Sequence, residues 1–200
     1  PPRRQRQMCI RDRYMFDWLK YEEDIKLQMI NLGGGFPSNY ISEVNPVGVY
    51  AEEIKRYLSE DFDDDEMPEI ILEPGRSLVG DSGVLVSEVV LISRKSRTDL
   101  TRWVYTDVGL FGGLIETLGE AIKYPVYTPK MQTASEKGTV ILAGPTCDSQ
   151  DIMYEEARYQ LPQDLEIGDK LYWLTTGAYT NSYSSVEFNG FPPLKVKYID

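Results

Sequence analysis

Three consecutive glycines follow a short apolar run in the segment LGGGFP, residues 32–37. Glycine lets backbone N–H groups turn toward one point, and without a Cβ it lets an anion approach the backbone closely. Gly33, Gly34 and Gly35 could therefore bind a phosphate. Glycine runs also form plain turns between a strand and a loop, so both interpretations stay open at this point.

A second segment, Glu73-Pro74-Gly75-Arg76, has the Pro-Gly pair typical of a type II turn. A carboxylate precedes this turn and a guanidinium follows it. An arginine in such a place could bind a phosphate through two parallel hydrogen bonds. The alternative is a simple ion pair between Glu73 and Arg76.

Two later segments combine reactive side chains with glycine. Residues 143–151, AGPTCDSQD, place Cys147 among polar neighbours, where it could act as a proton donor rather than as a small core residue. Residues 177–180, GAYT, are followed by FNGF at 188–191, and the hydroxyl of Tyr179 beside a glycine could reach an anion.

The elements that must position these residues change in kind along the chain. A helix-like pattern from Tyr14, a strand at 29–32, a helix at 47–58 and a strand at 69–72 alternate as in a parallel α/β sheet. Ligands of such sheets collect at the carboxyl ends of the strands, where both of the first two segments lie. We therefore expect a first domain over residues 14–83.

The remainder, residues 84–200, predicts a mostly β domain with a helix-like interlude at 112–122. The expected strands are 84–93, 102–107, 139–143, 169–176 and 194–199.

Composition excludes several classes of function. The 200 residues carry a net charge of −11, which repels nucleic acid, and no apolar run approaches the ~18 residues that cross a bilayer. The chain has no histidine and only two cysteines, so triads that need histidine and Cys-only zinc sites are excluded, and no metal site is expected. This cysteine content fits a cytoplasmic location.

Residues 1–13, PPRRQRQMCIRDR, differ sharply from the rest, with five arginines against one aspartate. We expect this stretch to be an extraneous leader, and the chain to be a piece of a longer protein.

In their order along the chain, LGGGFP, EPGR, GPTCDSQD and GAYT with FNGF resemble the pyridoxal-phosphate-dependent decarboxylases built on an alanine-racemase-like barrel. The resemblance is closest to bacterial-type ornithine decarboxylases and covers residues 16–200, the carboxy-terminal half of such an enzyme. It implies an α/β plus β fold, in which the last part of a (β/α)8 TIM-like barrel is followed by a mostly β domain.

The resemblance assigns pyridoxal 5'-phosphate as cofactor. It implies that Gly33, Gly34 and Gly35 hold the cofactor phosphate, together with Pro74, Gly75, Arg76 and Tyr179. Glu73 would face the pyridine nitrogen and keep the ring protonated, so that the ring can accept electrons as CO₂ leaves. An alanine racemase would be expected to have a cation there, so Glu73 favours a decarboxylase.

The same resemblance implies that Cys147 protonates Cα after CO₂ departs and that Asp148 binds the distal ammonium of the substrate. Glu120, Phe111 and Phe188 would complete the substrate site. Ornithine is the first expected substrate and lysine the second. A diaminopimelate decarboxylase, or a catalytically silent homologue similar to the antizyme inhibitors, is the alternative.

Members of this family are expected to form homodimers in which the Cys-Asp loop crosses into the neighbouring subunit's site. The lysine that forms a Schiff base with the cofactor and the histidine that stacks on its ring do not match any part of this sequence. We therefore expect this chain alone to be inactive.

Overall fold

The computed structural model describes residues 13–133 and 136–199, so residues 1–12 of the expected leader lie outside the described residues. The chain divides into two compact units. The first includes residues up to Phe36 and Val44–Gly75, and the second consists of Pro37–Glu43 and residues from Arg76 onward. The structural division thus lies at Gly75 and Arg76, whereas sequence analysis places the boundary after residue 83.

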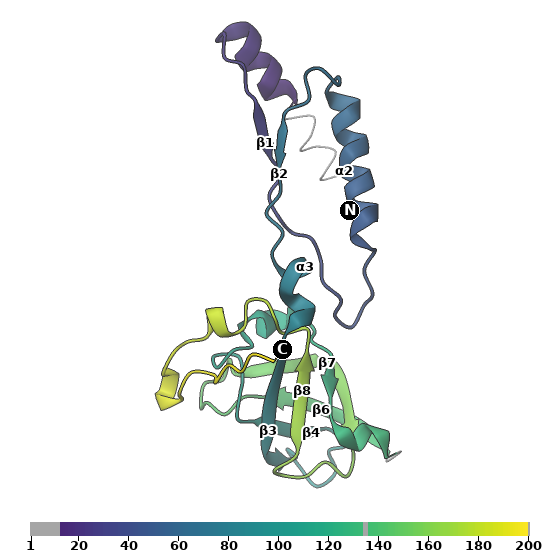
Figure 1. Cartoon of the computed structure of the whole chain (residues 1–200). Helices are drawn as coiled ribbons and strands as arrows, with labels where there is room; N and C mark the ends of the chain where they lie inside the picture. Colours follow the sequence, from purple (N-terminus) through teal and green to yellow (C-terminus); the bar gives the residue numbers. More distant parts are fainter. Residues whose placement is uncertain (1–12, 134–135, 200) are drawn as a thin grey trace. The chain divides into compact units, whose positions relative to one another are not determined.

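The first unit contains a β-α-β arrangement (Figure 1). Strand β1 (Met29–Asn31) lies parallel to β2 (Glu69–Ile71), and Ile30 is opposite Ile70. Helix α2 (Val47–Asp61) connects the two strands. Parallel neighbours need such a crossover, so the alternation expected from the sequence is confirmed here, while closure into a barrel remains a prediction.

Helix α2 starts after Pro46 and presents an exposed charged face to solvent. Arg56 forms ion pairs with Glu53 and Glu60, the i,i+3 and i,i+4 partners that lie beside it on a helix. Leu58 is buried on the opposite face, and the amide of Phe62 donates to its carbonyl oxygen at the helix end.

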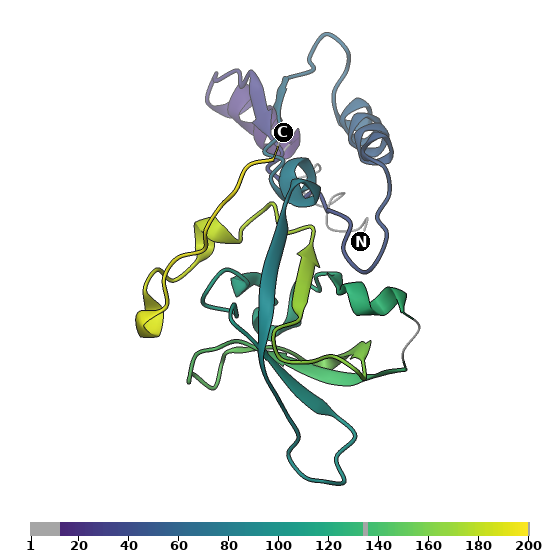
Figure 2. The same ribbon diagram turned by 60° about the horizontal axis from the view of Figure 1, so that its bottom comes forward.

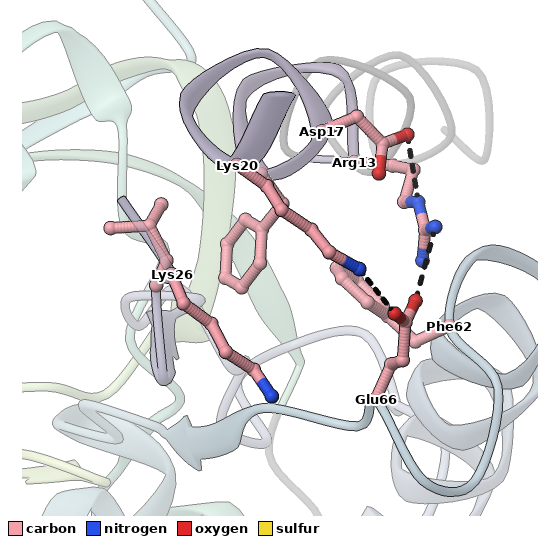
Figure 3. A pocket seen from close by; sticks show the side chains of 8 residues that line it. Arg13, Asp17, Lys20, Lys26, Phe62 and Glu66 are labelled. Atoms are coloured by element: carbon pink, nitrogen blue, oxygen red, sulfur yellow. Dashed lines mark hydrogen bonds and ion pairs between the residues drawn. The ribbon is translucent and has the colours of Figure 1, made fainter. Parts of the chain in front are cut away.

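Residues 13–22 form a further helix that packs against the end of α2. Phe16 meets Phe62 edge to face at 5.1 Å, and Glu66 accepts hydrogen bonds from both Arg13 and Lys20 (Figure 3). The cavity that these side chains enclose measures about 30 Å³, enough for roughly one water molecule. None of the site residues expected from the sequence lines this cavity.

The second unit is a six-stranded sheet that curls around one core (Figures 1 and 2). The strand order is β5-β8-β3-β4-β6-β7, and among the pairs of this sheet only β4 and β6 run parallel. The strands are β3 (Val84–Ser93), β4 (Arg102–Thr106), β5 (Val126–Tyr127), β6 (Lys137–Ala143), β7 (Ile152–Pro162) and β8 (Lys170–Leu174).

Strand β3 is central to the curl because its two halves pair with different neighbours. Residues 84–88 pair with β8, and from Val89 onward the strand pairs with β4 across a register shift. The core inside the curl is aromatic as well as aliphatic. Trp173 is fully buried, and its indole N–H donates to the hydroxyl of Ser87 at 2.8 Å.

The mostly β character of the second unit is confirmed, but four details differ from what the sequence predicts. Strands β5 and β7 were not expected, and residues 194–199 form no strand. The interlude at 112–122 is no regular helix either. It contains a kinked 3₁₀ segment, η2 (Ile115–Glu120), in which Gly119 has a left-handed backbone with φ of 60°.

Among the residues that the structure describes, no helix has the length and apolar character needed to cross a membrane.

Candidate active site

The first candidate segment lies where β1 and β2 end, in the first unit. The amide of Glu73 donates to the carbonyl oxygen of Gly33 at 2.8 Å, which extends the parallel pairing into the glycine segment. A Cβ on Gly34 would lie 2.3 Å from the carbonyl oxygen of Glu73, so only glycine fits there. Gly33 and Gly35 have left-handed backbones, with φ of 70° and 86°.

This part of the chain fits an oxyanion because it combines a tight turn with open space. A Cβ placed on Gly33 or Gly35 would meet no atom within 4 Å. Asn31 donates its side-chain amide to Glu73 Oε1 at 2.7 Å and accepts the amide N–H of Gly33 at 2.8 Å. Asn31 therefore orients the Glu73 carboxylate relative to the glycine turn, a role that the sequence did not indicate. Pro74 and Gly75 complete the first unit.

Arg76 begins the second unit, where Glu116 on η2 meets it. Its NH1 and NH2 nitrogens donate to the two oxygens of Glu116 at 2.8 and 2.6 Å, and NH1 also donates to the hydroxyl of Tyr40 at 2.8 Å. The hydrogen bond from Arg76 to Glu116 raises the pKa of the guanidinium, and burial raises the pKa of the Tyr40 hydroxyl. Arg76 thus forms its ion pair with Glu116, and not with Glu73 as one interpretation of the sequence suggested.

Tyr179 lies beside Arg76. The guanidinium carbon of Arg76 lies 5.1 Å from the centre of the Tyr179 ring, a cation–π distance. Close backbone packing fixes the Tyr179 loop against the end of α3 (Arg76–Val79), the short helix that begins at Arg76. A Cβ on Gly177 would lie 1.8 Å from the carbonyl oxygen of Val79, and the amide of Gly177 donates to Gly80.

The third segment lies beside the loop that follows β4. Because β4 and β6 are parallel neighbours, the loops that follow them, 107–114 and 144–151, emerge side by side. Asp151 connects these loops and is only 2% exposed. Its Oδ1 accepts the amide N–H of Leu110, and its Oδ2 accepts both the amide and the hydroxyl of Thr146.

Cys147 is exposed in the loop that Asp151 holds, and residues from two other segments lie beside it. The side-chain amide of Asn189 donates to the sulfur of Cys147 at 3.8 Å. The rings of Phe188 and Phe111 stack with their centres 4.2 Å apart, and the amide of Ser185 donates to the carbonyl oxygen of Phe111. The structure therefore places Cys147 beside Asn189, the residue that follows Phe188, and stacks Phe188 on Phe111.

The two acidic residues expected at the substrate both make backbone contacts. Asp148 Oδ1 accepts the amide N–H of Gln150, a local turn that shapes the Cys147 loop. Glu120 Oε1 accepts three successive amides of β7, from Glu155, Glu156 and Ala157, at 2.6–3.2 Å. Within the described residues, the second oxygen of each carboxylate accepts no hydrogen bond. It can therefore bind a ligand.

Three comparisons place these segments among known proteins. Residues 14–177 match the family model described as "Pyridoxal-dependent decarboxylase, C-terminal sheet domain". The chain is 33% identical over 172 residues to a diaminopimelate decarboxylase of Staphylococcus aureus, a match that covers 84% of this chain and 39% of the relative. It is 30% identical over 201 residues to the ornithine decarboxylase of Schizosaccharomyces pombe, which covers 95% of this chain and 43% of that protein.

Among solved structures, the chain resembles the lysine/ornithine decarboxylase of Vibrio vulnificus complexed with cadaverine. The TM-score is 0.79 at 27% identity, and the match covers 96% of this chain and 49% of that one. It also resembles the diaminopimelate decarboxylase of Helicobacter pylori complexed with L-lysine, with a TM-score of 0.73 at 29% identity, over 94% of this chain and 43% of that one. The chain thus spans less than half the length of these relatives.

Proposed function

Because the chain belongs to the pyridoxal-dependent decarboxylases, we propose that the full-length protein containing it removes CO₂ from a basic amino acid, most readily ornithine and next lysine. The observation that carries this proposal is that Asn189, the residue after Phe188, contacts Cys147, while the rings of Phe188 and Phe111 stack on each other. Asp148 follows Cys147 in the chain. A thiol, two aromatic rings and a carboxylate are what a site needs to protonate and to hold such a substrate.

Pyridoxal 5'-phosphate is the cofactor of this family, and the residues present fit it. The glycine turn at 33–35 leaves open backbone where a phosphate oxygen can approach, and Gly34 can only be glycine. Arg76 and Tyr179 supply a guanidinium and a phenol, with the guanidinium carbon 5.1 Å from the centre of the ring. Pro74 and Gly75 directly precede Arg76 in the sequence. We assign these residues to the cofactor phosphate.

The bound cofactor supplies an electron-accepting ring for the carbanion that remains when CO₂ leaves. Glu73 holds a proton at the pyridine nitrogen, and Asn31 fixes the carboxylate for that purpose by its 2.7 Å hydrogen bond. The thiol of Cys147 donates a proton to Cα, and its exposure in a loop allows it to reach a substrate. Phe111 and Phe188 exclude water beside the carbon chain.

The charges near Cys147 favour a substrate that ends in an ammonium group. Segments 109–120, 143–151 and 177–191 contain four Asp or Glu side chains beyond the buried Asp151 and no lysine or arginine. Asp148 and Glu120 are our candidates for the distal ammonium. Diaminopimelate carries a second carboxylate, which would need a cation that these segments do not provide.

We further propose that the protein is a cytoplasmic homodimer in which the exposed Cys147 loop of one subunit completes the site of the other. A silent, partner-binding homologue is less well supported, because such a protein would not need Glu73, Arg76, Cys147 and Asp148 together.

The direct test offers ornithine, lysine and meso-diaminopimelate to the full-length protein loaded with pyridoxal phosphate. We expect CO₂ and one equivalent of putrescine or cadaverine from the first two, with kcat/KM for ornithine at least about tenfold above that for diaminopimelate, since one uncompensated buried charge costs more than ~1.4 kcal/mol. A preference for diaminopimelate would contradict the substrate assignment, and no CO₂ from any substrate would contradict the enzymatic function.

The role of Cys147 can be tested through product identity. If Cys147 donates the proton to Cα, Cys147→Ala should still release CO₂ but shift protonation to the cofactor's own carbon. The expected products are then an aldehyde and the pyridoxamine form of the cofactor, measured by chromatography against CO₂ released. A variant that gives only the diamine at an unchanged rate would show that the thiol is not the donor.

A further inference from the structure

Glu116 pairs with Arg76 through two hydrogen bonds, one to each terminal nitrogen of the guanidinium. Building on the proposed function, we propose that Glu116 is a positioning residue, which holds the guanidinium so that one pair of its N–H groups faces the cofactor phosphate. Neither the motifs nor the comparisons assign any role to Glu116.

The first step is the pattern of hydrogen bonds on Arg76. Both N–H groups of NH1 are used, one by Glu116 Oε2 and one by Tyr40, and one N–H of NH2 is used by Glu116 Oε1. A guanidinium has five N–H donors. The two without a partner in the described part of the chain are Nε–H and the second N–H of NH2.

These two remaining donors are adjacent on one edge of the planar guanidinium. Such an edge matches two oxygens of a phosphate by parallel hydrogen bonds, which is the geometry that makes arginine a selective phosphate ligand. Glu116 binds the adjacent edge, which the two terminal nitrogens form, in the same manner. The carboxylate therefore fixes the plane of the group while leaving one complete binding edge available.

The second step concerns rigidity. Rings lie near the guanidinium from two segments, with Tyr179 at 5.1 Å and Tyr40 at 6.0 Å, and Tyr40 packs edge to face on the fully buried Tyr124. The side chains of Arg76 and Glu116 are 22% and 17% exposed, so both are largely shielded from competing water. An arginine held in this way loses little further rotamer freedom when an anion binds.

Two opposing effects determine the net result of removing Glu116. Its negative charge weakens the attraction of the site for an anion, whereas its two hydrogen bonds orient the arginine. Two-point binding needs the correct plane, and an arginine that can rotate out of this plane loses the two parallel hydrogen bonds to the phosphate. We therefore expect orientation to dominate.

The experiment compares pyridoxal phosphate with pyridoxal, which lacks the phosphate, in equilibrium binding to the full-length protein. Glu116→Ala should raise the Kd for pyridoxal phosphate about tenfold or more and leave the Kd for pyridoxal within about twofold. Glu116→Gln keeps one acceptor oxygen in nearly the same volume and should fall between. Arg76→Ala combined with Glu116→Ala should be no weaker than Arg76→Ala alone.

Glu53→Ala is the matched control, because Glu53 also pairs with an arginine, Arg56, but on the exposed face of α2. It should change neither Kd. Tighter binding of pyridoxal phosphate by Glu116→Ala would overturn the inference, as would equal losses for both ligands or additive losses in the double variant. This experiment measures binding and not decarboxylation, so the two proposals can fail separately. A protein that binds the phosphate as described but releases no CO₂ would refute the proposed function and leave the role of Glu116 intact.

Discussion

Replacing Asp148 with alanine is expected to lower kcat/KM for ornithine by roughly 30-fold or more. A carboxylate paired with an ammonium in a partly desolvated site contributes a few kcal/mol, and removing one partner leaves the other charge uncompensated, at a cost of roughly 2–5 kcal/mol. At about 1.4 kcal/mol per factor of ten, the lower end of this range already gives that loss.

The structure sharpens this experiment because Asp148 also shapes its own loop. Asp148 Oδ1 accepts the amide N–H of Gln150, and an asparagine can make the same contact without the negative charge. Asp148→Asn should therefore retain the loop but lose at least about tenfold in kcat/KM for ornithine. If Asp148→Asn behaves like the wild type while Asp148→Ala does not, the residue holds the loop and not the ligand.

The same variant can be tested in a double-mutant cycle in which a change of substrate takes the place of the second mutation. L-Norvaline has the carbon chain of ornithine without the terminal amine, so the loss caused by Asp148→Ala should be much smaller for it. Equal losses for the two substrates would mean that Asp148 does not contact the ammonium. Glu120 would then become the better candidate, through the oxygen that its backbone contacts with β7 do not use.

The local patterns in the sequence were sufficient to predict the elements that carry the first two motifs. Apolar residues spaced along a charged segment predicted α2. The short apolar runs at 29–32 and 69–72 predicted β1 and β2. Positive φ at Gly33 and Gly35 is likewise a local property of the chain. Such features depend on neighbours in sequence, so they can be inferred without knowing the fold.

Elements that depend on distant partners were predicted less well. Strand β7 contains Glu155, Glu156 and Ala157, which favour helices. The residues on either side of these three pair with β6, and Glu120 accepts the three amides where the register shifts. Residues 194–199 show the opposite case. Their alternation is typical of a strand, but nothing pairs with them in the described chain, and Tyr198 is 90% exposed.

The candidate site shows the same division. Cys147, Phe111 and Phe188 were expected at the substrate because of the family resemblance, and this role stays a prediction. The structure places Asn189 against Cys147 and stacks Phe188 on Phe111. Glu116 and Asp151 were missed because their partners lie 40 and 41 residues away along the chain. A bidentate ion pair or a buried carboxylate leaves no local pattern that would identify its partner.

Asp151 gives the prediction with the largest expected effect on the folded state. The carboxylate accepts three hydrogen bonds, and it lies against Gly109 and Gly144, where an added Cβ would approach its oxygens to 2.2 and 2.3 Å. Asp151→Ala would leave the amide of Leu110 buried without an acceptor, as well as the donors of Thr146. Each such donor costs about 1–3 kcal/mol, so we expect a loss of roughly 3–5 kcal/mol in the free energy of unfolding.

Asp151→Asn separates hydrogen bonding from packing, because it preserves the volume of the side chain. A carboxylate accepts on both oxygens, whereas an asparagine must direct an NH₂ group toward either Leu110 or Thr146, where a donor already points. We therefore expect Asp151→Asn to lower Tm by roughly 4 °C or more in thermal unfolding, whereas Asp148→Asn, in the same loop, should change Tm by less than about 2 °C. Because Asp151 joins the Phe111 loop to the Cys147 loop, the variant should also release some aldehyde product, as Cys147→Ala does. An unchanged Tm together with normal diamine formation would mean that the two loops keep their places without this carboxylate.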